Sequence, residues 1–224
     1  MVELQRDGDV FVLNLGAGEN RIDEALVSAL EDALNTAEGH EGPAALVTTG
    51  TGKFFSNGLN LEWLMGPGSG LGERFVARMQ VLFARWLTTG LPTVAALNGH
   101  AFAAGAMFAF AHDYRVMRED RGYLCINEVD LATGQPITRG MAELIGCRLT
   151  PRTFHEMLLT ARRYGGPDAV AAGAVHEAVA EERLLPRAVE LAASLADKHR
   201  PTVRANKQRL FEAVTTALRV PVRF

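Results

Sequence analysis

Hydrophobic and polar residues alternate over the first fifteen positions of the chain. The alternation surrounds Asp7-Gly8, a dipeptide typical of two-residue hairpin turns. This pattern predicts two antiparallel strands, at Val2–Gln5 and Val10–Leu15. From Asp23, which can cap a helix, leucine and alanine recur at helical spacing as far as Gly39, and they predict the first helix.

Strand and helix periods then alternate along the chain. Short apolar runs predict buried strands at Ala44–Thr49 and Pro92–Leu97, and an apolar stripe predicts a helix over Glu73–Thr89. The most apolar run, Ala101–Ala111, is well short of the roughly 20 residues that a membrane span needs, so it predicts a buried helix. Further strands are expected at Tyr114–Met117 and Tyr123–Ile126.

The last third of the chain has helical spacing almost throughout. Early strands with helices between them, followed by late helices, indicate an α/β fold. We expect residues 1–150 to form a core and residues 151–224 a helical C-terminal part. The glycine-rich stretch Met65–Gly72 predicts a mobile loop rather than a linker, because patterned segments flank it closely.

Composition narrows the classes of function. A chain of 224 residues can bury a large core without a disulfide or a metal. The net charge of −3 lacks the basic excess that nucleic-acid binding requires. The two cysteines, Cys125 and Cys147, fit neither a disulfide framework nor a zinc motif, so we expect a reducing, cytosolic location. The charged N-terminus does not resemble a secretory signal.

Several familiar catalytic motifs are incomplete in this chain. Gly50-Thr51-Gly52-Lys53 lacks the Ser or Thr of a phosphate loop, because Phe54 follows the lysine. Neither a GxGxxG fingerprint nor a GxSxG nucleophile elbow can be completed, and the histidines show no HExxH pairing. A Ser-His-Asp site stays open, since such partners are distant in sequence.

Two glycine-marked turns, at Phe54–Leu61 and Asn98–Met107, each follow a buried strand. A turn that opens a helix leaves backbone N–H groups without intrahelical partners, and the small residues at Ala103–Ala106 allow a ligand to approach the main chain. Two such N–H groups aimed at one point form an oxyanion hole. Ordinary strand-to-helix turns with tight helix packing explain the same pattern.

Glu128 lies in the apolar segment Tyr123–Leu131, YLCINEVDL. Acidic residues are poor strand formers and are seldom buried without a partner, so this carboxylate belongs either to an exposed rim or to a site. His100 either lines a pocket or is structural. Asp113 is expected to make a structural ion pair or to cap a chain reversal.

In their order and spacing, these segments resemble the crotonase, or enoyl-CoA hydratase/isomerase, superfamily. The resemblance covers the opening hairpin, the segment with Glu128, and Leu46–Leu64, Leu91–Met117, Gly166–Val179 and Pro201–Val214. It implies a crotonase-like spiral of ββα units with a helical C-terminal part, assembled as trimers or as hexamers of two trimers. It also implies an acyl-CoA thioester as the substrate, with no metal and no cofactor.

The resemblance assigns the reacting groups to particular residues. The backbone N–H groups of Leu59 and Ala104 correspond to the family's oxyanion hole. Glu128 corresponds to one of the two glutamates of the hydratases, whereas Met107 stands where the other belongs. Asn60 replaces the usual Asp after the first oxyanion residue, and we expect it to support the loop.

Further substrate contacts are implied at Asn57, Gly58, Met107 and Lys207. The carbonyl of Asn57 would face the adenine of CoA. Lys207 would reach a CoA phosphate, sometimes across a subunit contact, or it is an ordinary solvated charge. The loop 132–136 departs from the family pattern, which leaves the shape of the acyl pocket open.

The single glutamate, FFSNG and NEVDL are most similar to monofunctional Δ3,Δ2-enoyl-CoA isomerases. Hydration needs one group to activate water and another to deliver a proton, whereas moving a double bond from carbon 3 to carbon 2 needs one proton-shuttling base. We therefore expect an isomerase. Hydration, thioester hydrolysis or decarboxylation, and acyl-CoA binding without catalysis, are the alternatives.

Overall fold

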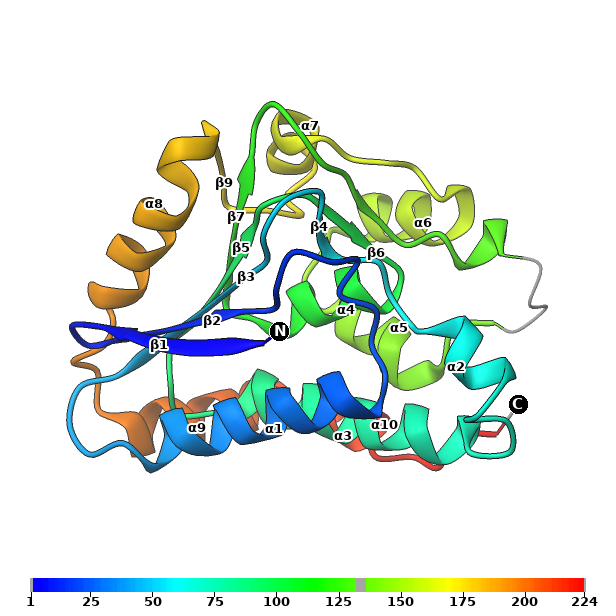
Figure 1. The fold of residues 1–224 in the computed structure, drawn as a ribbon, viewed down its shortest axis with the longest axis horizontal. Coiled ribbons are helices and arrows are strands. Elements are labelled where there is room, and N and C mark those ends of the chain that lie inside the picture. Colours follow the sequence, from blue (N-terminus) through cyan, green and yellow to red (C-terminus); the bar gives the residue numbers. More distant parts are fainter. Residues whose placement is uncertain (1, 132–135, 224) are drawn as a thin grey trace.

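A six-stranded sheet forms the centre of the fold in the computed structural model, which describes residues 2–131 and 136–223 (Figure 1). Its strands, in spatial order, are β1 (Glu3–Asp7), β2 (Val10–Asn14), β3 (Ala45–Thr49), β5 (Thr93–Leu97), β7 (Tyr114–Arg118) and β9 (Glu177–Val179). The predicted hairpin is confirmed, with β1 antiparallel to β2 and Gly8 in its turn at φ +57°. All other pairs in this sheet are parallel.

A second sheet of three short parallel strands lies beside the first one. It consists of β4 (Phe54–Ser56), β6 (His100–Phe102) and β8 (Leu124–Cys125). Each of these strands directly follows β3, β5 or β7 in the chain. The chain therefore adds one strand to each sheet in turn, in strand-strand-helix units. This arrangement confirms the predicted α/β spiral.

Two of these short strands, β4 and β6, differ from the elements that the sequence predicts. It predicted a turn where β4 lies, and a helix over the whole of Ala101–Ala111. Helix α4 spans only Ala104–Ala111, because β6 takes up residues 100–102. Strands of three residues are too short to show a period, and β6 merges with the apolar run of α4.

Helices cover both faces of the large sheet (Figure 1). On one face, α8 (Glu181–Ala193) buries alanine and leucine against alternate residues of β2, β3, β5 and β7. On the other face lie α1 (Glu24–Gly39), α3 (Gly72–Thr88) and the buried α4. The side chain of Asp23 caps α1 by accepting a hydrogen bond from the N–H of Leu26 at 3.0 Å, as predicted.

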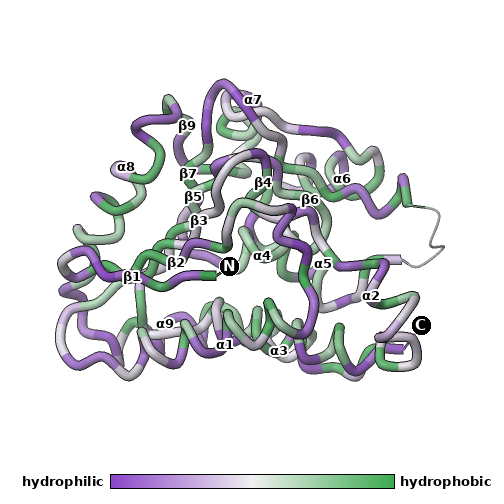
Figure 2. The backbone as a smooth tube through the Cα atoms, in the orientation of Figure 1, coloured by the Kyte–Doolittle hydropathy of each residue, from purple (hydrophilic) through white to green (hydrophobic). Residues whose placement is uncertain are grey.

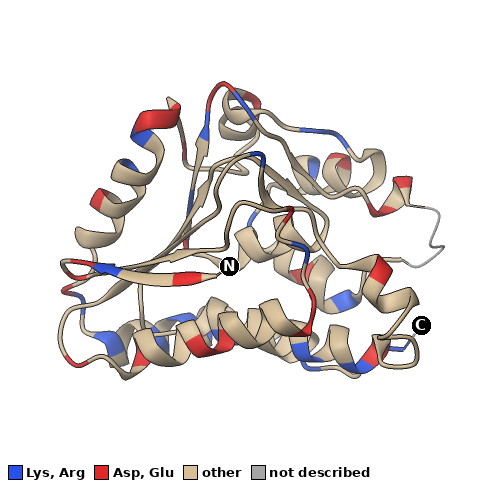
Figure 3. Ribbon diagram, viewed as in Figure 1, with Lys and Arg blue, Asp and Glu red and all other residues tan. Residues whose placement is uncertain are grey.

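Helix α4 is the most apolar helix of the structure (Figure 2). It carries no charged residue, whereas charged residues gather on the outer helices (Figure 3). All eight of its residues are buried. No helix within residues 2–131 and 136–223 combines the length and the apolarity needed to cross a lipid bilayer.

The C-terminal part is mainly helical, as predicted, and contains one short strand, β9. Its helices are α6 (Pro151–Thr160), α7 (Gly166–Ala171), α8, α9 (Arg200–Leu210) and α10 (Glu212–Leu218). Helix α10 packs against α3 and α5 (Arg139–Gly146). The remaining short helices are α2 (Leu61–Met65) and the 3₁₀ turn η1 (Glu128–Asp130).

Candidate active site

A cavity of ≈ 580 Å³ lies where the two glycine-marked turns meet η1. Five residues singled out from the sequence line it, and they come from three separate segments: Asn57, Leu59, Ala104, Met107 and Glu128. The rest of the lining is largely apolar, with Leu64, Val76, Met79 and Met141 among its residues. We call it the reaction cavity.

The two turns touch each other at Gly58. This residue has φ +82°, a conformation that glycine adopts without strain. A Cβ here would lie 3.0 Å from the Cβ of Ala103 and 3.1 Å from the carbonyl oxygen of Phe102. At Gly105, a Cβ would lie 2.4 Å from the carbonyl oxygen of Ser56. The two glycines thus allow the turns to approach within backbone contact.

The Leu59 N–H is left free by the way its neighbours are bonded. The N–H of Ile22 donates to the carbonyl of Gly58 at 2.7 Å, and the N–H of Asn60 donates to the carbonyl of Ile22 at 2.9 Å. In this parallel bridge Leu59 lies between the two bonded residues, so its N–H points away from Ile22. Within the described part of the chain, it donates to no acceptor.

Ala104 begins helix α4, so its N–H has no acceptor inside the helix. No acceptor for it occurs elsewhere in residues 2–131 and 136–223. The preceding residue, Ala103, has φ +48° and ψ −124°, and its N–H donates to the carbonyl of Cys125 at 3.0 Å. Such backbone strain, which costs on the order of 1–3 kcal/mol, collects at functional sites.

Glu128 is half-buried, and one oxygen of its carboxylate, Oε2, is fully buried. Its Oε2 has no hydrogen-bond partner among the described residues. Burial raises the pKa of the carboxyl to about 7, and the residue's own backbone hydrogen bond opposes part of that rise. A carboxylate with this pKa holds and releases a proton near neutral pH.

Some functional features were not predicted from the sequence. Val76 and Met79 looked like core positions of an amphipathic helix, yet both line the reaction cavity. Asn127 also lines it, and its buried Oδ1 has no partner among the described residues. Its place next to Glu128 was the available signal. Arg21 also lines the reaction cavity, and it forms ion pairs with Glu19 and Glu62.

Asn60 has a structural role in the loop, as expected. Its Oδ1 accepts a hydrogen bond from the N–H of Trp63 at 3.1 Å and so caps α2. Its Nδ2 donates to Asp23 at 3.4 Å. Most of the unusual loop at 132–136 lies outside the described residues, apart from Pro136, which lines the reaction cavity.

Lys207 does not lie with the other predicted site residues. Its ammonium donates to Asp113 at 2.6 Å and to the carbonyl of Leu91 at 2.8 Å. With 11% of its side chain exposed, it is not the solvated charge that the sequence left open. Burial lowers the pKa of the ammonium, and Asp113 opposes that change. Asp113 makes the structural ion pair expected of it, and this pair joins α9 to the turn between α4 and β7.

The reaction cavity thus combines two free N–H groups, one buried carboxylate and an apolar wall. Paired N–H groups can hold an oxyanion, and the carboxylate can move a proton. An apolar wall strengthens both interactions because it excludes water.

Comparisons with known proteins agree with this picture. A family model described as "Enoyl-CoA hydratase/isomerase" matches residues 9–222. Enoyl-CoA delta isomerase 3 of Arabidopsis thaliana is 37% identical over 206 residues, which cover 88% of this chain and 86% of the relative. Carnitinyl-CoA dehydratase of Salmonella enteritidis is 29% identical over 212 residues, covering 92% and 78%. A Mycobacterium tuberculosis protein has two solved structures, one named as a probable enoyl-CoA hydratase and the other as an enoyl-CoA isomerase. Both are 29% identical to this chain with a TM-score of 0.89, and the matches cover 98% of this chain and 92% and 95% of those chains.

Proposed function

The chain belongs to the enoyl-CoA hydratase/isomerase family, and from that premise we propose that it moves the double bond of an enoyl-CoA from carbon 3 to carbon 2. The observation that carries this proposal is the single buried acid of the reaction cavity. Of the described residues that line it, two are acidic, Glu62 and Glu128. The side chain of Glu62 is 84% exposed. Glu128 is therefore the one acid placed for proton transfer in an apolar environment.

The reaction follows from the positions of these groups. The thioester oxygen accepts hydrogen bonds from the N–H groups of Leu59 and Ala104. Glu128 takes a proton from carbon 2, and the electron pair of that C–H bond moves toward the carbonyl oxygen as an enolate. The double bond re-forms between carbons 2 and 3 when Glu128 returns the proton to carbon 4. Each N–H donor is worth about 2.7–4 kcal/mol to the charged intermediate.

The surroundings of Glu128 favour proton return over water addition. Met107, on the buried helix α4, contributes no acid or base to the cavity. Met79 and Met141 extend the apolar wall. Hydration requires a second group to position water, and isomerisation does not. We propose that the carbonyl of Asn57, at the same cavity, faces the adenine of CoA.

The direct test is to offer purified protein a 3-enoyl-CoA and to follow the absorbance of the conjugated 2-enoyl thioester. We expect isomerisation to be faster than water addition to crotonyl-CoA. Deuterium uptake at carbon 2 in heavy water separates catalysis from binding alone. Tight binding with neither turnover nor exchange would refute an enzymatic role.

Hydration or dehydration is the second candidate, and one observation favours it. The unpartnered Oδ1 of Asn127 lies beside Glu128 on the cavity wall, where it could accept a hydrogen bond from a water molecule. The similarity to a carnitinyl-CoA dehydratase points in the same direction. Water addition at a rate equal to or above that of isomerisation would support this reaction instead.

The pH dependence provides a separate prediction. Because Glu128 acts first as a base, it must enter the reaction without its proton. With its pKa raised to about 7 by burial, kcat/KM should rise about tenfold per pH unit below pH 7 and level off above it. A pH series of initial rates measures this profile. A rate that falls as the pH rises through 7 would contradict the assignment of Glu128 as the base.

We further propose that residues 1–150 and 151–224 form the acyl-CoA core and an assembling C-terminal part of a trimer or of a hexamer. Sedimentation at micromolar concentration tests this, and a monomer would count against it. The cytosolic location stays a prediction from the composition.

A further inference from the structure

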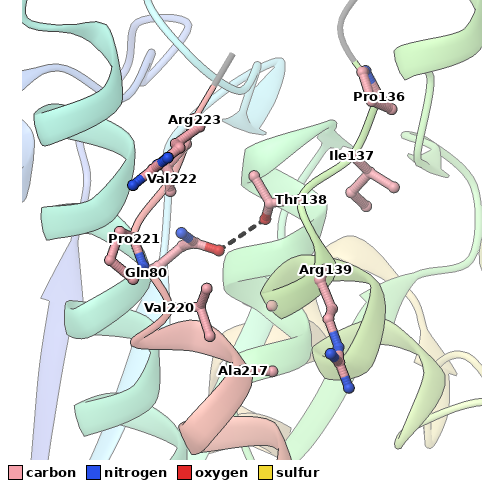
Figure 4. A pocket seen from close by; sticks show the side chains of 11 residues that line it. Gln80, Pro136, Ile137, Thr138, Arg139, Ala217, Val220, Pro221, Val222 and Arg223 are labelled. Carbon is pink, nitrogen blue, oxygen red and sulfur yellow. Dashed lines mark hydrogen bonds between the residues drawn. The ribbon is translucent and has the colours of Figure 1, made fainter.

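A second cavity, of ≈ 260 Å³, adjoins the reaction cavity (Figure 4). It is lined by Gln80 of α3, by the start of α5, and by the chain that follows α10. Pro136, Ile137 and Thr138 line both cavities. On α3, Met79 lines the reaction cavity and its neighbour Gln80 lines the second one. One short stretch of chain therefore forms the partition between the two spaces.

Gln80 gives this second cavity an unused hydrogen-bond donor. The residue is 1% exposed. Its Oε1 accepts a hydrogen bond of 2.7 Å from the hydroxyl of Thr138, which in turn accepts one from the N–H of Met141 (Figure 4). In this arrangement Oε1 is the acceptor end of the amide, because the Thr138 hydroxyl donates to it. The Nε2 of Gln80 is buried and has no partner in the described part of the chain.

A buried amide N–H without an acceptor is unfavourable, so the position calls for an acceptor that the described residues do not supply. The cavity is larger than the roughly 10–15 Å³ that one water molecule requires. Ile137, Val220 and Val222 form an apolar part of its wall, which suits a hydrocarbon chain. An apolar chain that carries an oxygen would match both features.

The charges at this cavity favour an anionic oxygen. Its charged lining residues, within the part of the chain described, are Arg139 and Arg223, and both are cationic. The side chain of Arg139 is 82% exposed and lies 3.9 Å from Glu143, so it can turn toward a ligand at the rim. No carboxylate among the described lining residues competes for these cations.

We propose that the second cavity holds the far end of the acyl chain and that Gln80 recognises an acceptor oxygen there, a terminal carboxylate above all. The substrate class is then an enoyl-CoA whose chain ends in a carboxyl group. This inference rests on the proposed function, because it takes the thioester to lie at Leu59 and Ala104. From there the chain passes Met79 and crosses the partition at Ile137.

Equilibrium binding of saturated acyl-CoA esters tests the proposal without turnover. Esters that end in a methyl group are compared with esters of the same chain length that end in a carboxylate, over a series of lengths. We expect the carboxylated ester to bind about tenfold more tightly at the length that reaches Gln80, as a charged hydrogen bond allows. Gln80→Met, which keeps the side-chain length but removes the oxygen and the nitrogen of the amide, should abolish that preference.

Two further variants control the experiment. Gln208→Met makes the same change on the exposed face of α9, and it should leave the preference intact. Arg139→Gln changes an exposed position and does not endanger folding. It should reduce the preference for a carboxylate-ended ester over a methyl-ended one. It should not reduce the preference for a keto-ended ester over a methyl-ended one. If the wild-type protein showed no preference at any length, the cavity would hold only water. If Gln80→Met kept the preference, Gln80 would not be the group that recognises the oxygen, and the proposal would be wrong.

The outcomes also separate this inference from the proposed function. Isomerisation of plain 3-enoyl-CoA without any preference for polar chain ends would overturn the inference and leave the isomerase intact. A length-dependent preference in binding, in a protein that isomerises no substrate, would support the second cavity and refute the isomerase.

Discussion

Replacing Glu128 by glutamine is expected to lower the kcat of isomerisation by about 10³-fold or more, because a positioned acid or base typically contributes 10²–10⁴-fold. Glutamine has nearly the same shape, but it cannot take a proton from carbon 2. The two N–H groups of the proposed oxyanion hole are unaffected, so CoA esters should still bind. Initial rates with a 3-enoyl-CoA and binding of a saturated acyl-CoA measure the two effects separately.

The same variant should be more stable than the wild type at alkaline pH. Burial raises the folded-state pKa of Glu128 to about 7, above its ordinary value of 4.5. The unfolded chain therefore releases this proton at lower pH, and the free energy of unfolding falls as the pH rises from about 4.5 to 7. Glu128→Gln removes that loss. We therefore expect its free energy of unfolding to exceed that of the wild type by about 2–3 kcal/mol at pH 8 and to equal it below pH 4. Denaturant unfolding at both pH values measures it.

Asp130→Asn is the matched control, because Asp130 lies on the same 3₁₀ turn but is exposed. It undergoes the same change from acid to amide at an exposed position, and it should leave the rate of isomerisation unchanged. An equal loss of activity in both variants would mean that the turn, rather than the carboxylate, matters. Full activity in Glu128→Gln would remove the proposed mechanism.

Local structure could be predicted from the sequence where a single segment determines it. The cap at Asp23, the hairpin turn at Gly8 and the apolar stripe of α3 depend on residues close together in the chain. The short strands β4 and β6 depend instead on residues far apart in the chain, since strands of three residues form only by pairing with each other. Their pairing also brings the turn at Gly58 against Ala103, so the convergence of the two turns depends on contacts between distant segments.

The family resemblance predicted which residues belong to the candidate site. It did not predict which side chains surround those residues. The burial of Glu128 depends on the cavity around it, which Val76 and Met79 of α3 help to form. The sequence left Lys207 open as a contact to a CoA phosphate or as a solvated charge, and it did not predict that Asp113, 94 positions earlier in the chain, binds its ammonium. A pattern within one segment cannot show which of two distant charges will meet. The same is true of Gln80 and Thr138, which are 58 positions apart.

Gly58→Ala is expected to lower the kcat of isomerisation about 10²-fold, the typical effect of losing one oxyanion donor. The new Cβ would lie 3.0 Å from the Cβ of Ala103 and 3.1 Å from the carbonyl oxygen of Phe102, so one turn must shift relative to the other. The N–H of Leu59 moves with Gly58, whereas that of Ala104 is held by α4. Because the donors matter most when charge develops on the thioester oxygen, kcat should fall more than KM rises. Steady-state kinetics gives both constants.

Backbone strain alone would be a competing explanation, and Gly8→Ala tests it. Gly8 has φ +57°, also in the left-handed region, but a Cβ there meets no atom within 4 Å. Both substitutions therefore place an alanine at positive φ, with a cost to stability of about 1 kcal/mol each. Only the change at Gly58 separates the two N–H groups. If Gly8→Ala reduced kcat as strongly, or if Gly58→Ala left kcat unchanged, the contact between the turns would not set the geometry of the oxyanion hole.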